Sequence, residues 1–153
     1  MSDQLNNQEV KLTIPAHADY VDLVRLTLYG LANKIGFSYE EIEDMKVAVS
    51  EACNNAVLYA YGDGSEGNVD IVFTIGEREI GVIIRDHGTS FDTDQKANRP
   101  DAWHDKALEE VQSGGLGFYL MQALMDEVEV ISLEGRGTEV RMRKSISLCE
   151  ETL

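Results

Sequence analysis

Five short segments of the chain have the pattern of hydrophobic and polar residues that predicts β-strands. Apolar and polar positions alternate most clearly in the first three, and this alternation is typical of a strand with one buried face. The second and third segments are separated by a turn near residues 76–78, so we expect them to form a hairpin. The five predicted strands cover residues 10–14, 69–75, 80–85, 128–133 and 138–143.

Two helices are predicted between the first and second strands, because apolar residues recur there at steps of three and four. The first covers 19–35, and Gly36 fits the position that stops a helix. Ser38 followed by Glu41 forms a capping box. A second helix is therefore expected to begin there and to continue through 45–61.

A third helix is predicted over 118–125, directly after a glycine-rich turn. The order is therefore strand, helix, helix, strand, strand, helix, strand, strand. This order predicts an α+β fold, a two-layer α/β sandwich in which helices cover one face of a mixed sheet.

Glu51 and Asn55 are the first candidates for chemistry. They lie four residues apart on the second predicted helix, which places both side chains on one stripe, about 6 Å apart along the axis. A neighbouring stripe is apolar and predicts that this helix packs on the core. Taken alone, such a pair is most simply two solvated polar residues.

Asp86 and Gly88 follow the third predicted strand. An aspartate at a strand end, beside a glycine that leaves space, can accept a hydrogen bond from an exocyclic amine such as that of adenine. The alternative is an ordinary turn, which Asp and Gly favour for local reasons.

The glycine-rich turn before the third helix is suited to bind phosphate. Glycines let the backbone approach a ligand closely, and the helix that follows begins with free N–H groups. It is neither a Walker A loop nor a Rossmann fingerprint, and the eukaryotic kinase motifs are absent. The residues best placed for phosphate are Gly115, Leu116 and Gly117.

Composition narrows the class of protein. The chain has 153 residues, which indicates one domain, and a formal net charge of −15 that argues against general nucleic-acid binding. Cys53 and Cys149 have no nearby partner motif, so neither a disulfide framework nor a zinc site is expected. The polar N-terminus and the lack of a long apolar run predict a cytoplasmic protein without a membrane span.

Taken in order, the motifs E-x-x-x-N, D-x-G, G-G-x-G and G-T resemble the N, G1 and G2 boxes of the GHKL ATPases, which share the Bergerat fold. The residues at 21–30, 48–57 and 114–128 resemble the RsbW family more closely. Members of that family are serine-protein kinases and anti-sigma factors of the bacterial general stress response, and they are relatives of SpoIIAB. The resemblance covers nearly the whole chain.

The resemblance implies a role for each candidate residue. Glu51 would be the general base that takes the proton from an attacking serine, and Asn55 would bind Mg²⁺. Asp86 would bind the adenine amine, with Gly88 clearing space and Thr138 supporting the contact. The residues that would hold the phosphates of ATP are Gly114, Gly115, Leu116 and Gly117.

The resemblance also implies an ATP lid over about 93–113, and it implies partners. The domain would form a homodimer and sequester a sigma factor. It would also phosphorylate a small STAS-domain anti-anti-sigma protein on serine. Arg25 matches a position that contacts both partners, although it fits a solvated charge equally well. Gln112 and Ser113 stand where an arginine finger would be expected, so the cation that stabilises the phosphate is unassigned.

Other functions are weighed against this one. An ATP-binding anti-sigma or switch module that transfers no phosphate would need the same nucleotide motifs. The catalytic half of a histidine kinase would need extra helices with a phosphoacceptor histidine, and a gyrase- or MutL-like ATPase would need a transducer domain. The sequence favours a kinase for protein serine.

Overall fold

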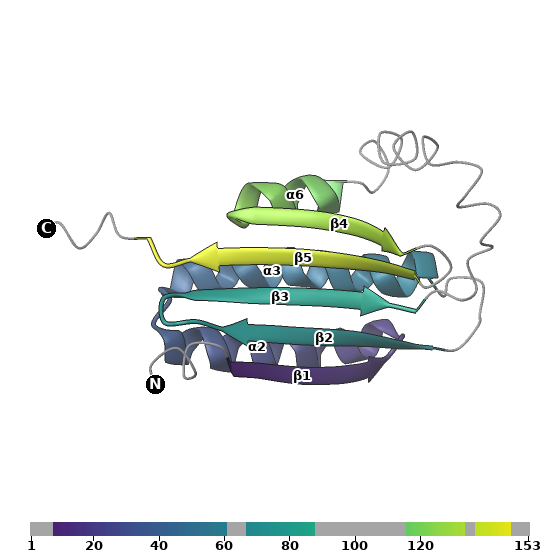
Figure 1. The fold of residues 1–153 in the computed structure, drawn as a ribbon, viewed down its shortest axis with the longest axis horizontal. Helices are drawn as coiled ribbons and strands as arrows, with labels where there is room; N and C mark the ends of the chain where they lie inside the picture. Colours follow the sequence, from purple (N-terminus) through teal and green to yellow (C-terminus); the bar gives the residue numbers. More distant parts are fainter. Residues whose placement is uncertain (1–7, 61–66, 88–115, 134–136, 148–153) are drawn as a thin grey trace, which may run out of the picture.

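The computed structural model describes residues 8–60, 67–87, 116–133 and 137–147 (Figure 1). Five strands form one sheet in the order β1-β2-β3-β5-β4. All five predicted strands are confirmed, each extended by one to three residues in total at its ends. Their bounds are β1 (Gln8–Pro15), β2 (Asn68–Ile75), β3 (Glu79–Asp86), β4 (Glu127–Leu133) and β5 (Gly137–Ser145).

In the described part of the chain, three α-helices lie on one face of this sheet, which confirms the predicted two-layer α+β fold (Figure 1). A short 3₁₀ turn, η1 (Ala18–Tyr20), leads into the first of them. The helices are α2 (Val21–Ile35), α3 (Tyr39–Asn55) and α6 (Leu116–Leu124).

The pairing of the strands differs in one respect from the mixed sheet expected from the sequence. All four pairings among the described strands are antiparallel. β3 and β4 are both antiparallel to β5, so these two strands run in the same direction. Because the antiparallel β5 lies between them, β3 and β4 are not hydrogen-bonded to each other, and the sheet contains no parallel pair among the described strands.

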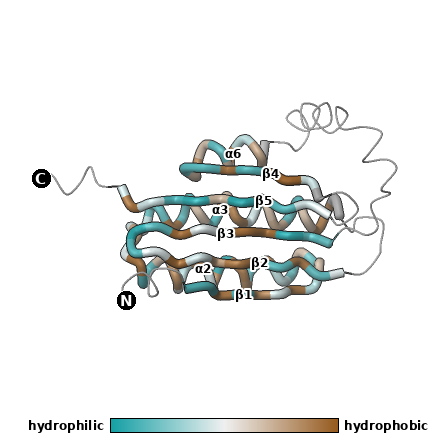
Figure 2. The backbone as a smooth tube through the Cα atoms, in the orientation of Figure 1, coloured by the Kyte–Doolittle hydropathy of each residue, from teal (hydrophilic) through white to brown (hydrophobic). Residues whose placement is uncertain are grey.

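The core lies between the sheet and the helices, and hydrophobic residues (brown in Figure 2) occur in the elements of both layers. Phe73 on β2 and Val82 on β3 are fully buried, and both are Cα partners across the hairpin. Leu28 of α2 and Met45 of α3 are also fully buried. Burial of large apolar side chains such as these contributes about 1.5–3 kcal/mol each. The amphipathic patterns of the sequence therefore predicted the correct buried faces.

The predicted helix boundaries between α2 and α3 are confirmed. Gly36 adopts φ 114°, the left-handed conformation that ends a helix, and its N–H donates to the carbonyl of Ala32. The Ser38 hydroxyl accepts a hydrogen bond from the Glu41 N–H at 3.2 Å, and the Glu41 carboxylate accepts one from the Ser38 N–H at 2.9 Å. This capping box satisfies two backbone donors at the start of α3.

Removing the cap should lower stability measurably. Ser38→Ala is expected to reduce the free energy of unfolding by about 1 kcal/mol, because the Glu41 N–H loses its acceptor. Urea denaturation followed by circular dichroism measures the change. Ser38→Asp keeps an acceptor at the same position and is the matched control. Equal loss in both variants would contradict the role of the cap.

The second predicted helix changes its winding where its polar stripe ends. The α-helical part stops at Asn55, and a π-helical segment, η2 (Ala56–Ala60), continues it. At this junction the Ala56 N–H donates to two carbonyls, those of Ala52 and Cys53. Wider π turns often occur at functional sites, which draws attention to Asn55. The last residue of the predicted helix, Tyr61, lies outside the described residues.

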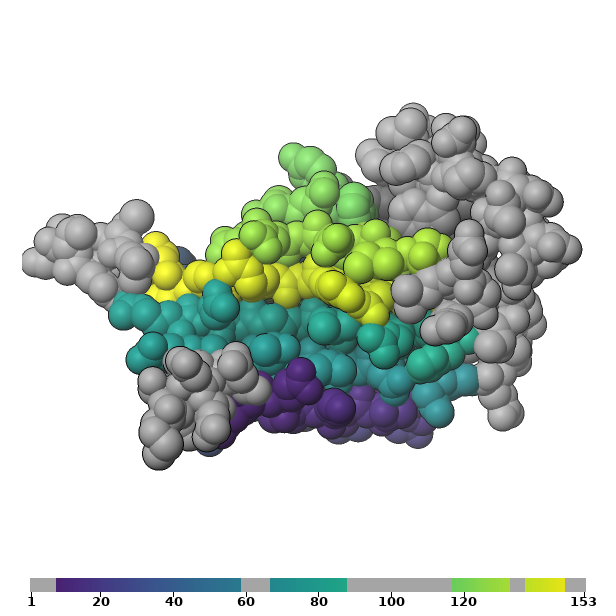
Figure 3. All heavy atoms as spheres, viewed as in Figure 1, coloured from purple at the N-terminus to yellow at the C-terminus, as the bar shows by residue number. Residues whose placement is uncertain are grey.

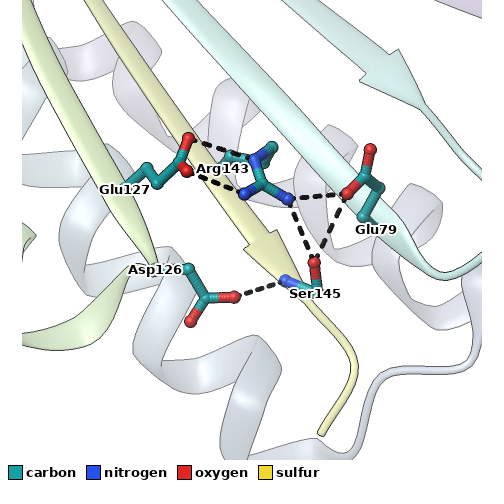
Figure 4. A network of polar contacts seen from close by, with 5 residues as sticks. All are labelled: Glu79, Asp126, Glu127, Arg143 and Ser145. Atoms are coloured by element: carbon teal, nitrogen blue, oxygen red, sulfur yellow. Dashed lines mark hydrogen bonds and ion pairs between the residues drawn. The ribbon is translucent and has the colours of Figure 1, made fainter.

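The other face of the sheet carries no helix in the described part of the chain, and its side chains form one continuous surface in Figure 3. At one end of this face, Arg143 of β5 bridges the neighbouring strands (Figure 4). Its guanidinium donates to Glu79 of β3 at 2.7 Å and to Glu127 of β4 at 2.9 Å. Ser145 adds a backbone bond to Asp126 at 2.8 Å. This network ties β3, β5 and β4 together.

Candidate active site

Glu51 lies against the first turn of α6. Gly117 is buried there, and a Cβ atom placed on it would come within 2.4 Å of Glu51 Oε1 and 3.2 Å of its Cδ. Only a glycine allows this approach without displacing the carboxylate. Helix α3 packs along α6, so the E-x-x-x-N helix and the end of the glycine-rich motif form one site.

Asn55 occupies the last position of α3, one turn beyond Glu51. Both side chains are half-buried, whereas the side chain of their neighbour Asn54 is exposed. The structure therefore keeps Glu51 and Asn55 on one stripe, as predicted, and places Asn54 off it. The η2 segment that follows packs against β3, which joins this part of the site to the end of the sheet.

Asp86 ends β3 and is almost completely buried, with 5% of its surface exposed. Its Oδ1 accepts a hydrogen bond from the Thr138 N–H at 3.1 Å, so the two residues that were predicted to contact adenine together are in direct contact, while their role toward adenine stays a prediction. Figure 1 shows that the end of β3, the start of β5, the start of α6 and the end of α3 lie at the same end of the molecule.

Gly137 is a residue of this site that sequence reasoning did not single out. It has φ +102°, and a Cβ atom on it would lie 2.0 Å from the carbonyl oxygen of Asp86 and 2.7 Å from its Oδ1. The backbone of β5 therefore touches Asp86 at a place where no side chain fits. The G-T pair in the sequence held this signal, but only its threonine was assigned a role.

Arg25 of α2 is bound to the residue that precedes Glu51. Its Nη1 donates to the Ser50 hydroxyl at 2.9 Å, and it also forms an ion pair with Asp22. The Ser50 side chain is buried on α3. Arg25 is therefore anchored between two helices, and the interpretation as a freely solvated charge is not supported.

Burial raises the pKa of the Cys53 thiol to about 12, and the nearby Arg25 charge lowers it only in part. This thiol stays protonated at neutral pH and is a poor nucleophile, since the thiolate is the reactive form. Cys53 is therefore a packing residue of α3, as its place in the predicted helix indicated.

Comparison with known proteins places the chain in a family. A model of the histidine kinase-like ATPase domain matches residues 14–144. The serine-protein kinase RsbW of Bacillus velezensis is 45% identical over 139 residues, which cover 90% of this chain and 86% of that protein. The same-named protein of Bacillus subtilis is 44% identical and covers 85% of this chain and 82% of its own length. The chain belongs to the RsbW family.

A solved structure supports the fold of this RsbW-family chain. The crystal structure of the RsbU and RsbW domains of a Mycobacterium tuberculosis protein matches with a TM-score of 0.62 and 20% identity. The match covers 90% of this chain and 32% of that longer one. At this identity the likeness concerns the fold alone, and it agrees with the Bergerat architecture expected from the motifs.

Several predicted residues of the RsbW-family site lie outside the described residues. These are Gly88, Gly114, Gly115 and the lid segment 93–113. Leu116 is described as the first residue of α6, by its backbone. The phosphate-binding prediction is therefore represented in the structure by Gly117 and the start of α6. No group of three or more metal-ligating His, Cys, Asp or Glu side chains occurs in the described part of the chain.

Proposed function

We propose that the chain is an ATP-dependent protein-serine kinase that phosphorylates a STAS-domain anti-anti-sigma protein and sequesters a sigma factor. The observation that carries this proposal is the contact between Glu51 and Gly117. It holds a carboxylate beside the N-terminal end of α6, and a helix N-terminus favours bound phosphate through its free N–H groups and dipole.

Glu51 acts on the acceptor in this mechanism. Its carboxylate takes the proton from the serine hydroxyl while the oxygen attacks the γ-phosphorus of ATP, and the bond to the β-phosphate oxygen breaks to release ADP. The product is phosphoserine. Glu51 is half-buried on a packed helix, so its position is fixed before the acceptor arrives.

The donor set fits Mg²⁺ bound mainly by the nucleotide. Asn55 offers one carboxamide oxygen, a hard ligand of the kind that Mg²⁺ prefers, and a neutral ligand suffices beside negatively charged phosphates. Mg²⁺ would supply charge neutralisation on the transferring phosphate. Since the described residues contain no larger acidic cluster, the remaining ligands would be phosphate and water oxygens.

Asp86 is the residue we assign to the adenine amine. It is buried and held by Thr138, so its orientation is defined before the base binds. A buried acceptor of this kind discriminates strongly against a base that lacks the matching donor.

The experiment that tests the function uses ATP, Mg²⁺ and the STAS-domain protein encoded next to this chain. Intact-mass measurement of that protein should show the gain of one phosphate on a serine. Nucleotide binding without any gain in mass would favour the second candidate, an ATP-binding anti-sigma or switch module without transfer.

Gly117→Ala should separate catalysis from folding. The new methyl group would meet the flexible end of the Glu51 side chain, which can rotate away, so we expect little loss of stability. Moving the base by about 1 Å should lower the transfer rate by about 100-fold. Gly30→Ala is the matched helical control, because nothing lies within 4 Å of the added atom. An unchanged rate in Gly117→Ala would contradict the assigned role of the contact.

We assign the partners to the exposed side of α2 and place the protein in the cytoplasm, where sigma factors act. A groove of about 440 Å³ lies there, lined by Asp22, Arg25, Leu26, Tyr29 and Lys46. Leu26 and Tyr29, which both line this groove, are 67% and 44% exposed, and large apolar side chains exposed together mark interaction sites. A homodimer that leaves this groove accessible would present two such surfaces to the partners. The described residues include no helix that is long and apolar enough to span a bilayer.

Arg25→Glu is expected to weaken binding of the STAS-domain protein by at least tenfold, measured by titration calorimetry with the purified pair. The charge reversal opposes Asp22 and removes the bond to Ser50. Lys34→Glu, in the last turn of the same helix and outside the groove, is the control. Equal binding by both variants and the unmodified protein would exclude Arg25 from the interface.

A further inference from the structure

Glu139 is a second buried carboxylate beside the proposed base-binding residues. Among the described residues, Glu139 and Asp86 are the buried charged side chains, with 2% and 5% of their surface exposed. Glu139 directly follows Thr138 on β5, but it belongs to the helix-free face of the sheet together with its Cα partner Arg85. The proposed mechanism gives this carboxylate no role.

Two arginines hold the Glu139 carboxylate. Arg85 binds one oxygen, Oε1, through Nε at 2.8 Å and through Nη2 at 2.6 Å. Arg141 binds the other oxygen, Oε2, through its Nε. Both oxygens are therefore satisfied, and the carboxylate is fixed in its plane and its direction.

The Arg85–Glu139 pair is the last pair of the β3–β5 ladder. At the next position, Asp86 and Thr138 are joined through the Asp86 side chain. One residue further, Gly137 touches Asp86 so closely that a Cβ atom would not fit. The ion pair therefore lies where the regular pairing of the strands stops and the contacts of the base site begin.

The ion pair fixes geometry more than it adds stability. Burying a carboxylate is costly, and replacing a buried ion pair by apolar residues often leaves stability unchanged. Burial raises the pKa of Glu139, but the hydrogen bonds from Arg141 and Arg85 outweigh it and hold this pKa below the ordinary value of 4.5. Above pH 4.5 the Glu139 carboxylate is ionised, and its pairing with the arginines stabilises the fold. This contribution to stability is lost as the pH falls through the lowered pKa of Glu139.

We propose that Glu139, held by Arg85, is a positioning residue for recognition of the nucleotide base. It keeps the ends of β3 and β5 together, so that the Thr138 N–H stays on Asp86 and leaves this carboxylate aimed at the base. This inference rests on the proposed ATP site, and it identifies the ion pair that makes this site selective for the base.

The same strands offer a matched control at their other end. Glu79 and Ser145 form the first pair of the β3–β5 ladder, and Arg143 clamps that pair as Arg85 and Arg141 clamp Glu139 (Figure 4). Glu79→Gln therefore weakens a similar polar clamp on the same two strands, six residues along β3 from Arg85. Any effect on the base site that is specific to Glu139 must be absent in Glu79→Gln.

The test compares Glu139→Gln with Glu79→Gln by two measurements. Amide hydrogen exchange followed by NMR should show exchange of the Thr138 N–H accelerated by at least tenfold in Glu139→Gln, and unchanged in Glu79→Gln. Dissociation constants for ATP and for inosine triphosphate, whose base lacks the exocyclic amine, give the second readout. Glu139→Gln should raise the dissociation constant of ATP by about three- to tenfold, as expected for the loss of one well-placed hydrogen bond. It should leave the dissociation constant of inosine triphosphate unchanged.

Unchanged Thr138 exchange in Glu139→Gln would overturn the inference, whatever the nucleotide affinities are. Equal weakening of ATP binding and inosine triphosphate binding would also overturn the inference, because a general loss of structure weakens the binding of both nucleotides. Should Glu139→Gln fail to fold, Arg85→Lys keeps the charge but loses the two-donor fork, and the same outcomes apply to it. If the unmodified protein binds ATP and inosine triphosphate equally, the assignment of Asp86 fails, while Thr138 exchange still decides the positioning role.

Discussion

Replacing Glu51 with Gln is expected to lower the rate of phosphate transfer at least about 100-fold while ATP still binds. The amide has nearly the shape of the carboxylate, so the packing against Gly117 is retained. It cannot accept the serine proton, so the step that requires a base is lost. Single-turnover transfer from ATP to the STAS-domain protein, followed by intact mass, measures the rate, and fluorescence titration measures ATP binding.

Glu40→Gln provides the control for this experiment. Glu40 is exposed in the first turn of the same helix and does not line the groove assigned to the partners, so the exchange should change stability by less than about 1 kcal/mol. Its transfer rate should equal that of the unmodified protein. Full activity in Glu51→Gln would show that another group takes the proton, and the role assigned to Glu51 would be wrong.

Gly137→Ala is expected to damage both the fold and the base site. Its φ of +102° is strained for any residue with a side chain, and the new atom would meet the backbone oxygen of Asp86 at 2.0 Å. Backbone cannot rotate away as a side chain does, so β3 and β5 must separate locally. We expect the free energy of unfolding to fall by about 2–4 kcal/mol and ATP binding to weaken by more than tenfold.

Gly81→Ala tests whether the position of the glycine decides this result. Gly81 is the third residue of β3, and an added Cβ atom would make ordinary contacts, the nearest at 3.6 Å to Thr74. Chemical denaturation should therefore show a change of less than about 1 kcal/mol. A loss in Gly81→Ala as large as that in Gly137→Ala would mean that glycine matters throughout the strand, and the special contact with Asp86 would lose its support.

Local signals in the sequence were sufficient for much of the fold. The capping box at Ser38, the left-handed stop at Gly36 and the alternation in β2 and β3 each depend on residues within a few positions of one another. Such features follow from backbone sterics and local hydrogen bonds, and the structure contains all of them. The position of β5 between β3 and β4 depends on contacts far apart in the sequence, and periodicity carries no information about it.

In the candidate site, too, local sequence signals predict some features and miss those that depend on distant segments. The four-residue spacing of Glu51 and Asn55 was enough to place them on one stripe of α3. The approach of Gly117 to Glu51 joins two segments more than 60 residues apart, so only the family resemblance linked them beforehand. Gly137 and Glu139 were missed because nothing in their neighbours shows that one touches Asp86 and the other is buried between two arginines.

The position of β5 between β3 and β4 has a consequence during synthesis on the ribosome. Among the described strands β5 is made last, yet it fills the gap between β3 and β4 and brings Gly137 and Thr138 to Asp86. While the residues of β5 are still inside the ribosome, the emerged part of the chain has its helices and its hairpin. Its sheet is incomplete, and the edges of β3 and β4 are unpaired. In the site proposed here, selection of a nucleotide base therefore requires this strand to insert.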